Sequence, residues 1–164
     1  MIKKNIQEIE NYLKGITQRV TNMKPIMHTI GEKVVSKSME SFEKERDPIT
    51  GQAWSPVSSN TTFAQIGGKK RSNTKRGKQK LSDKRVLQDQ GIRGGLMGSI
   101  DFTATKNSTE ITAGKEYAAT HFFGDKKRNI AQRRFLPFDD DLDLDKKLAN
   151  EIIEDIEDYI LGDS

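Results

Sequence analysis

The chain of 164 residues contains no cysteine and only two histidines. Without cysteine there is no disulfide framework and no thiolate metal site, which suits a reducing compartment. Two isolated histidines also provide no Ser/His/Asp or Cys/His arrangement of the kind that nucleophilic catalysis needs. We therefore expect a protein that is not an enzyme and that holds neither a cofactor nor a metal ion.

Long apolar runs are missing as well. Hydrophobic residues make up 33% of the chain, and even with glycine included the apolar share stays below the roughly 45–50% of typical globular domains. No run is long enough to span a membrane, and no apolar signal core develops after the first residues. We expect a soluble chain without a membrane partner. We also expect it to be partly unfolded and to complete its core against other subunits.

Basic residues are scarce at the C-terminal end of the chain. Residues 139–164 contain eleven acidic and two basic residues, a net charge of −9, whereas residues 1–138 carry +13, which gives +4 overall. Such a charge dipole favours head-to-tail association of copies or contact with a polyanion. Charges that only keep the protein soluble are the commoner alternative.

Two helices are predicted at the N-terminal end. Isoleucine, leucine and valine recur every three or four residues over residues 2–20, which predicts a helix with a narrow apolar stripe that must pack against something. A second helix is predicted to begin at Pro25, since proline is tolerated in the first turn. It ends before Asp47, where a turn with Gly51 follows. Trp54, just after this turn, is expected to close the edge of the core.

The most regular helical pattern lies at the other end, from Leu144 to Ile160, with an apolar residue every four positions. Asp143 or Asp145 can cap its start, and Gly162 follows its last turn. Its opposite face is strongly acidic.

Alternation of apolar and polar residues predicts strands between these helices. Residues 100–104 and 111–113 alternate around a turn at residues 106–108, which is typical of a β-hairpin. Residues 117–123 are predicted to add the next strand and to bury Tyr117 and Phe123. The predicted fold class is therefore α+β. We expect an antiparallel meander of about four strands packed with a long N-terminal helix and a C-terminal helix, together with a long basic flexible loop.

That loop comprises residues 67–85, which contain nine lysines and arginines and one large apolar residue, Leu81. No helical or strand period is visible, so the composition predicts a mobile loop. A solvated loop and a polyphosphate contact remain alternatives, but the lack of aromatic residues argues against base stacking. We divide the chain into an N-terminal helical extension (residues 1–22) and one α+β domain (residues 23–164).

A second cationic segment lies within residues 117–138. It stands between a stretch of small and aromatic residues and a second apolar stretch. A charged surface between two apolar anchors indicates a segment held out for a partner, although a core strand with a surface loop is the simpler interpretation. The candidate contacts for assembly or for a DNA channel are the cations of both segments: Lys69, Lys70, Arg71, Lys75, Arg76, Lys126, Lys127, Arg128, Arg133 and Arg134.

Hard-cation binding has one candidate, the aspartate run at residues 139–145. Read as a calcium loop beginning at Asp139, it places Leu144 where glycine is needed and Asn150 where glutamate is needed, so the pattern fails. His121 has no second ligand at metal-binding spacing.

Five motifs in order resemble the phage virion morphogenesis proteins, the tail-completion family that includes phage Mu and phage P2 members. They lie within roughly residues 30–160 and are DPITGQAWSPVS (47–58), VLQDQGIRGGLMGSI (86–100), YAATHFFG (117–124), RRFLPF (133–138) and the C-terminal helix. The residues that mark the resemblance most clearly are Gly51, Trp54, Tyr117, His121, Gly124 and Phe135.

The resemblance implies a structural neck component that joins tail to head. It implies a homo-oligomeric ring, possibly a hexamer, that contacts the head connector and the tail tube, while genome DNA passes through the opening. The protein would then lie at the head–tail junction of the virion, after assembly in the host cytoplasm of an active phage or a prophage. The first alternative is a basic DNA-binding protein outside any virion, although no helix-turn-helix spacing supports it. The second is a metal-dependent nuclease that uses Asp139 and Asp141.

Overall fold

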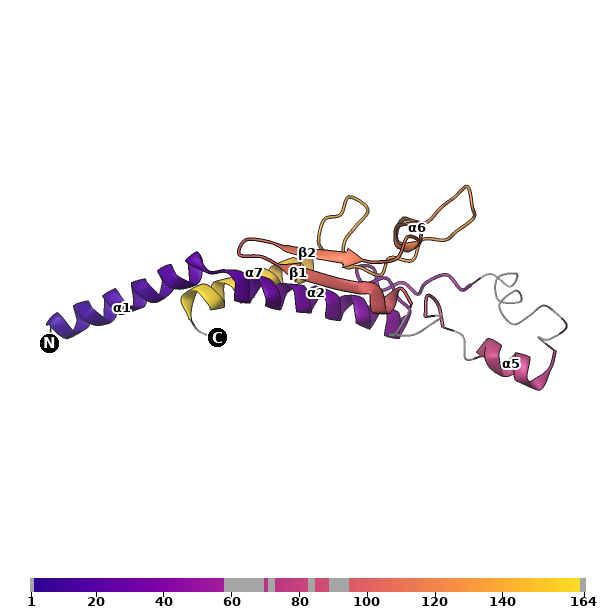
Figure 1. Cartoon of the computed structure of the whole chain (residues 1–164), viewed down its shortest axis with the longest axis horizontal. Coiled ribbons are helices and arrows are strands. Elements are labelled where there is room, and N and C mark those ends of the chain that lie inside the picture. The colour runs from indigo at the N-terminus through magenta and orange to yellow at the C-terminus, as the bar shows by residue number, and fades with distance from the viewer. Residues whose placement is uncertain (1, 58–69, 71–72, 83–84, 89–94, 163–164) are drawn as a thin grey trace.

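The computed structural model describes residues 2–57, 70, 73–82, 85–88 and 95–162. In this part of the chain, five helices and one antiparallel hairpin form an elongated molecule, with α1 at one end of the long axis and α5 at the other (Figure 1). The helices are α1 (Ile2–Thr21), α2 (Lys24–Lys44), α5 (Lys75–Ser82), α6 (Ala118–Phe123) and α7 (Lys146–Leu161), and the strands are β1 (Ile100–Ala104) and β2 (Thr109–Ala113). The α+β class is confirmed.

The first two helices follow one another with a short break at Asn22 and Met23, as the sequence predicts. Pro25 occupies the first turn of α2, where its missing N–H costs no helical hydrogen bond. The helix ends at Glu45, which adopts a left-handed conformation with φ 51°. Gly51 then takes a positive φ of 70° in the turn that follows.

The hairpin lies along α2 (Figure 1). Its register pairs Ile100 with Ala113 and Phe102 with Ile111, so the apolar side chains share one face. Gly31 of α2 allows the close approach, because a Cβ atom there would lie 2.1 Å from the ring of Phe102. The predicted hairpin is therefore confirmed, and α2 supports it.

The C-terminal helix α7 begins and ends where the sequence predicts. The carboxylate of Asp145 accepts a hydrogen bond from the backbone N–H of Leu148 at 3.1 Å, and Gly162 closes the helix with φ 86°. Leu148 and Ile152 are buried against Val34 of α2. This contact joins the C-terminal helix to α2.

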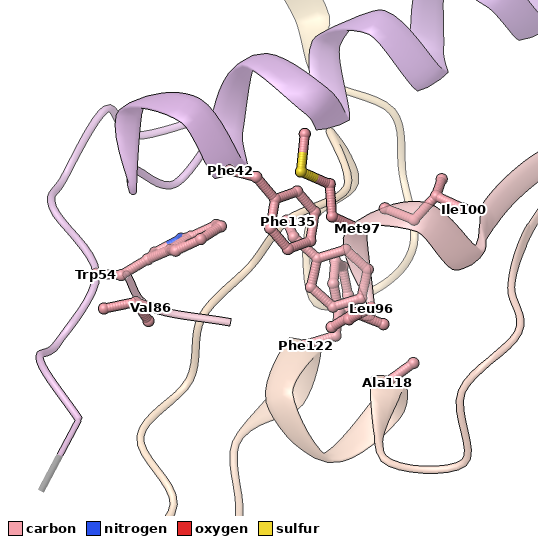
Figure 2. Packing of buried hydrophobic residues seen from close by; sticks show 9 residues of the cluster. All are labelled: Phe42, Trp54, Val86, Leu96, Met97, Ile100, Ala118, Phe122 and Phe135. Atoms are coloured by element: carbon pink, nitrogen blue, oxygen red, sulfur yellow. The ribbon is translucent and has the colours of Figure 1, made fainter. Parts of the chain in front are cut away.

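The larger core cluster surrounds Phe42, which is fully buried near the end of α2 (Figure 2). The Trp54 ring meets Phe42 edge to face, with ring centroids 5.4 Å apart. Trp54 is thus buried as expected, and this geometry is a favourable one for aromatic pairs. The cluster consists of Phe42, Trp54, Val86, Leu96, Met97, Ile100, Ala118, Phe122 and Phe135.

The predicted four-strand meander is wrong. In the described residues the sheet has two strands, and residues 118–123 form the helix α6 instead of a third strand. Tyr117 and Phe123, expected to be buried, are 45% and 48% exposed, whereas Phe122 is buried. A helical turn separates the two neighbouring phenylalanines by about 100°, so Phe122 can enter the core while Phe123 faces outward.

The basic segment also departs from the prediction of an irregular mobile loop. Residues 75–82 form the helix α5, whose first turn is capped by a hydrogen bond from Gly77 N–H to the Thr74 hydroxyl at 3.0 Å. Lysine, arginine and glutamine are good helix formers, so a helix needs no apolar stripe here. The predicted packing of the sheet on a long N-terminal helix is fulfilled by α2, while α1 projects away from the hairpin (Figure 1).

None of the helices in the described ranges is long and apolar enough to cross a membrane.

Candidate functional site

The cationic candidates fall into two structural groups. Lys70, Lys75 and Arg76 are exposed in the basic segment around α5, and the loop after α6 exposes a second set at residues 126–128. Both lie toward the end of the molecule opposite α1 (Figure 1). Arg133 and Arg134, in contrast, lie largely inside the fold. Lys69 and Arg71 fall outside the described residues.

Arg133 is buried, with 8% of its surface exposed. Its guanidinium donates hydrogen bonds to the carbonyl oxygens of Ser55 at 2.9 Å and Pro56 at 3.1 Å, and its backbone N–H donates to the His121 carbonyl at 2.7 Å. Burial lowers the pKa of Arg133. This side chain therefore fixes the backbone that follows Trp54 and is not available to a partner.

Arg134 joins the turn at residues 47–54 to the aspartate run at residues 139–145. Its guanidinium donates to Asp47 at 2.7 Å and to Asp140 at 2.6 Å, while its backbone carbonyl accepts a hydrogen bond from the Trp54 indole N–H at 2.9 Å. The hydrogen bond from Arg134, followed by one from Gln132, holds the pKa of the Asp140 carboxyl below its ordinary value. Charge-assisted hydrogen bonds of this kind favour the ionised carboxylate and position the loops that carry it.

Asp47 has a second role in the turn that precedes Trp54. Its side-chain oxygen accepts hydrogen bonds from the backbone N–H groups of Ile49 at 2.9 Å and Thr50 at 3.0 Å. This arrangement is typical of aspartate at the start of a turn. The same carboxylate thus shapes the turn and pairs with Arg134.

The loop after α6 is a tight and well-defined structure. Asp125 and Ile130 pair through two backbone hydrogen bonds of 2.8 Å. Gly124 precedes them with φ 74°, and a Cβ atom there would lie 2.9 Å from the backbone N of Gln132. Only glycine fits this position without strain.

The tip of this loop carries one paired and two exposed cations. Arg128 is paired with Asp125 at 2.6 Å and donates to the Thr120 hydroxyl at 3.0 Å. Hydrogen bonds from Arg128 are the main cause of the lowered pKa of Asp125. Lys126 and Lys127 are exposed and form no ion pair with any residue in the described ranges. These two lysines are therefore the accessible charge of the segment.

His121 is a packing residue in this structure. Its Nδ1 atom is buried without a hydrogen-bond partner in the described chain, and its ring meets Tyr117 edge to face. Burial, followed by the charge of Arg133, lowers the pKa of His121, which keeps the imidazole neutral. Among the residues whose positions are described, no three histidine, aspartate or glutamate side chains gather into a possible metal site.

The aspartate run after Phe138 is also used by the fold. The side chain of Asp139 accepts hydrogen bonds from the backbone N–H groups of Asp141 at 3.0 Å and Asp143 at 2.9 Å. The carboxylate proposed for a nuclease site therefore shapes a turn, which leads into α7.

Two features of the structure could not be predicted from the sequence. Ser55, Pro56 and Asp47, which bond to the side chains of Arg133 and Arg134, lie 77 to 87 positions away, so no local pattern marks these contacts. The apolar stripe of α1 was recognised, but the structure shows that most of it is exposed.

Comparison with known proteins decides the family. A family model described as the phage virion morphogenesis family matches residues 4–160 of the chain. The chain belongs to the phage virion morphogenesis family. The predicted resemblance is confirmed. No curated protein and no solved structure matches the chain.

The motifs that carry the family resemblance meet in space. In this virion morphogenesis protein, the segments 47–57, 117–124 and 133–138 converge beside Trp54 through Arg133, Arg134 and the His121 carbonyl. Phe135 adds its side chain to the same core (Figure 2). The motif residues thus build the fold, whereas the exposed Lys126 and Lys127 lie on the loop after α6 and the exposed Lys75 and Arg76 lie on α5.

Proposed function

We propose that this protein is a structural tail-completion component that joins the phage tail to the head, and that it works as a ring of identical subunits rather than as an enzyme. The observation that carries the proposal is the match to the phage virion morphogenesis family along residues 4–160. The partners in this proposal are other copies of the chain, the head connector and the tail tube.

Features of the single chain support an assembling subunit. Several large apolar side chains on α1 are about half exposed, although a monomer gains by burying them. The charge is divided between a basic body and an acidic C-terminal region, which favours contacts between unlike ends of neighbouring copies.

The exposed cations supply a contact surface in this proposal. Lys75 and Arg76 on α5, with Lys126 and Lys127 on the loop after α6, face solvent at the end opposite α1 (Figure 1). We assign them to contact with an acidic neck partner or with the DNA that passes through the ring, because such contacts need accessible positive charge.

The test is complementation of a phage that lacks the gene. Without the protein, we expect electron micrographs to show separate heads and tails and the titre to fall by several orders of magnitude. The Lys126→Ser/Lys127→Ser and Lys75→Ser/Arg76→Ser variants are expected to restore far fewer infectious particles than the wild type. The matched control is Lys24→Ser/Lys106→Ser, which removes two exposed lysines elsewhere on the body.

The micrographs test whether the protein joins heads to tails, and the titres test whether the exposed cations form the contact surface. Joined particles in the absence of the protein would contradict the proposed function. Full titres with both double variants would remove the cations of α5 and of the loop after α6 from the proposal.

DNA binding outside a virion is the second candidate, and the exposed cations of α5 are the observation that favours it. It predicts that the purified subunit binds duplex DNA and that log K falls linearly with log salt, by about 0.9 for each phosphate contacted. Gel-shift titrations of the wild type and Lys75→Ser/Arg76→Ser at several salt concentrations test this candidate. Loss of a salt-dependent complex in the variant would support it.

A further inference from the structure

The N-terminal helix α1 carries an apolar seam that the described chain does not cover. Ile6, Ile9, Leu13 and Val20 lie on one side of the helix and are 51% to 59% exposed. Successive members of the full stripe are three or four residues apart. This is the spacing with which one helix packs along another.

In the described part of the chain, α1 is held to the rest of the molecule at its C-terminal end. The Arg19 guanidinium donates hydrogen bonds to the carbonyl oxygens of Ile160 at 2.8 Å and Leu161 at 3.1 Å, and the Tyr159 hydroxyl donates to the Asn22 carbonyl at 2.7 Å. These bonds hold the C-terminal end of α1 against the C-terminal end of α7. From there α1 runs away from the rest of the molecule (Figure 1).

A matching surface exists on α7. Ile153 is 52% exposed, and Ile160 is half-buried further along the same side of the helix. Ile156 lies between this strip and the smaller core cluster, against which it packs. Glu154 and Glu157 are exposed beside them. The outer side of α7 therefore combines an apolar strip with an acidic border.

The two helices have opposite net charge. The segment of α1 contains four basic and two acidic residues, a net +2, whereas that of α7 contains two basic and five acidic residues, a net −3. Opposite charges on two surfaces favour their association and suppress pairing of each surface with its own kind.

We propose that the apolar seam of α1 in one copy packs on the outer side of α7 in a second copy. This inference rests on the proposed self-association of the chain and specifies which two surfaces meet in it. Because the two surfaces differ, every copy can use both at once, so the contact is head-to-tail and continues around a ring. It buries Ile9 and Leu13 against Ile153 and brings acidic side chains of α7 next to a basic helix.

Disulfide trapping tests the contact directly, since the wild-type chain has no cysteine. Ile6→Cys, Ile9→Cys and Leu13→Cys are each mixed with an Ile153→Cys protein that carries a mass tag, and the mixture is oxidised. We expect a mixed disulfide dimer with at least one of the three seam variants. The control is Asn11→Cys, on the opposite side of α1, which is expected to yield none. Dimers of the seam variants with themselves, without mixed dimers, would overturn the proposal in favour of pairing between two α1 helices.

The mass in solution separates this inference from the proposed ring. Light scattering should show an oligomer for the wild type and for Asn11→Ala/Gln18→Ala, and a loss of oligomer for Ile9→Gln/Leu13→Gln. Both substituted positions are exposed and glutamine is a good helix former, so circular dichroism should be unchanged. If the glutamine variant keeps the wild-type mass, the α1 contact is wrong while the ring stands. A wild type that stays monomeric at all concentrations would overturn both.

Discussion

Two arginines form aspartate ion pairs in very different surroundings. The side chain of Arg134 is 11% exposed where it meets Asp47, whereas Arg128 is 62% exposed beside Asp125. We expect Arg134→Ala to lower the free energy of unfolding by roughly 3 kcal/mol, because a largely buried carboxylate loses its partner. Arg128→Ala should change it far less, since an exposed pair is screened by water. Urea denaturation of both variants measures the difference, and equal losses would contradict the assignment.

The sequence could not show which cations of residues 126–134 are accessible and which are used by the fold. The sequence presents one cationic segment that contains Lys126, Lys127, Arg133 and Arg134. The side chains of the two arginines, however, bond to Ser55 and Asp47, which lie far away in the chain. Only the folded arrangement shows that the lysines are accessible and the arginines are not. By contrast, the positions of Trp54 and Gly51 follow from local turn chemistry and were predicted.

At the scale of elements, the contact between α2 and the hairpin depends on Gly31. A Cβ atom at this position would meet three ring atoms of Phe102 at 2.1–2.5 Å. We expect Gly31→Ala to lower the free energy of unfolding by about 1–3 kcal/mol through overpacking, even though alanine favours helices. Thr29→Ala, on the exposed side of the same helix, should be close to neutral. Thermal unfolding measures both, and a stabilised Gly31→Ala protein would show that the hairpin can move away at no cost.

Some helices and strands show a regular spacing of apolar residues in the sequence, and others do not. The helices α1, α2 and α7 have apolar residues at helical spacing, and the hairpin has strict alternation around a polar turn, so all four were predicted. The helix α6 has six residues, too few to show a period, and its aromatic residues favour a strand. The helix α5 has no apolar face to reveal it. Family membership was predictable because it depends on the order of motifs and not on these local assignments.

For the molecule as a whole, α1 is separate from the hydrophobic core. Neither core cluster of the described residues includes a side chain from α1, whereas α7 contributes Leu148 and Ile152. We expect deletion of residues 1–21 to lower the free energy of unfolding by at most about 2 kcal/mol, which is the order of the few hydrogen bonds lost. Deletion of residues 146–162 should abolish cooperative unfolding. Calorimetry of the two truncated chains compares them, and a large loss for the first would show that α1 belongs to the folded body.

The hydrogen bonds of Arg19 have a geometric consequence because α1 is long. Its 20 residues extend for about 30 Å, so any change of angle at its last residues is amplified along its length. A tilt of about 10° at this pivot moves the tip by about 5 Å, close to one helical turn. The hydrogen bonds of Arg19 and of the Asn22 carbonyl at the base of the helix therefore determine how accurately its far end is aimed.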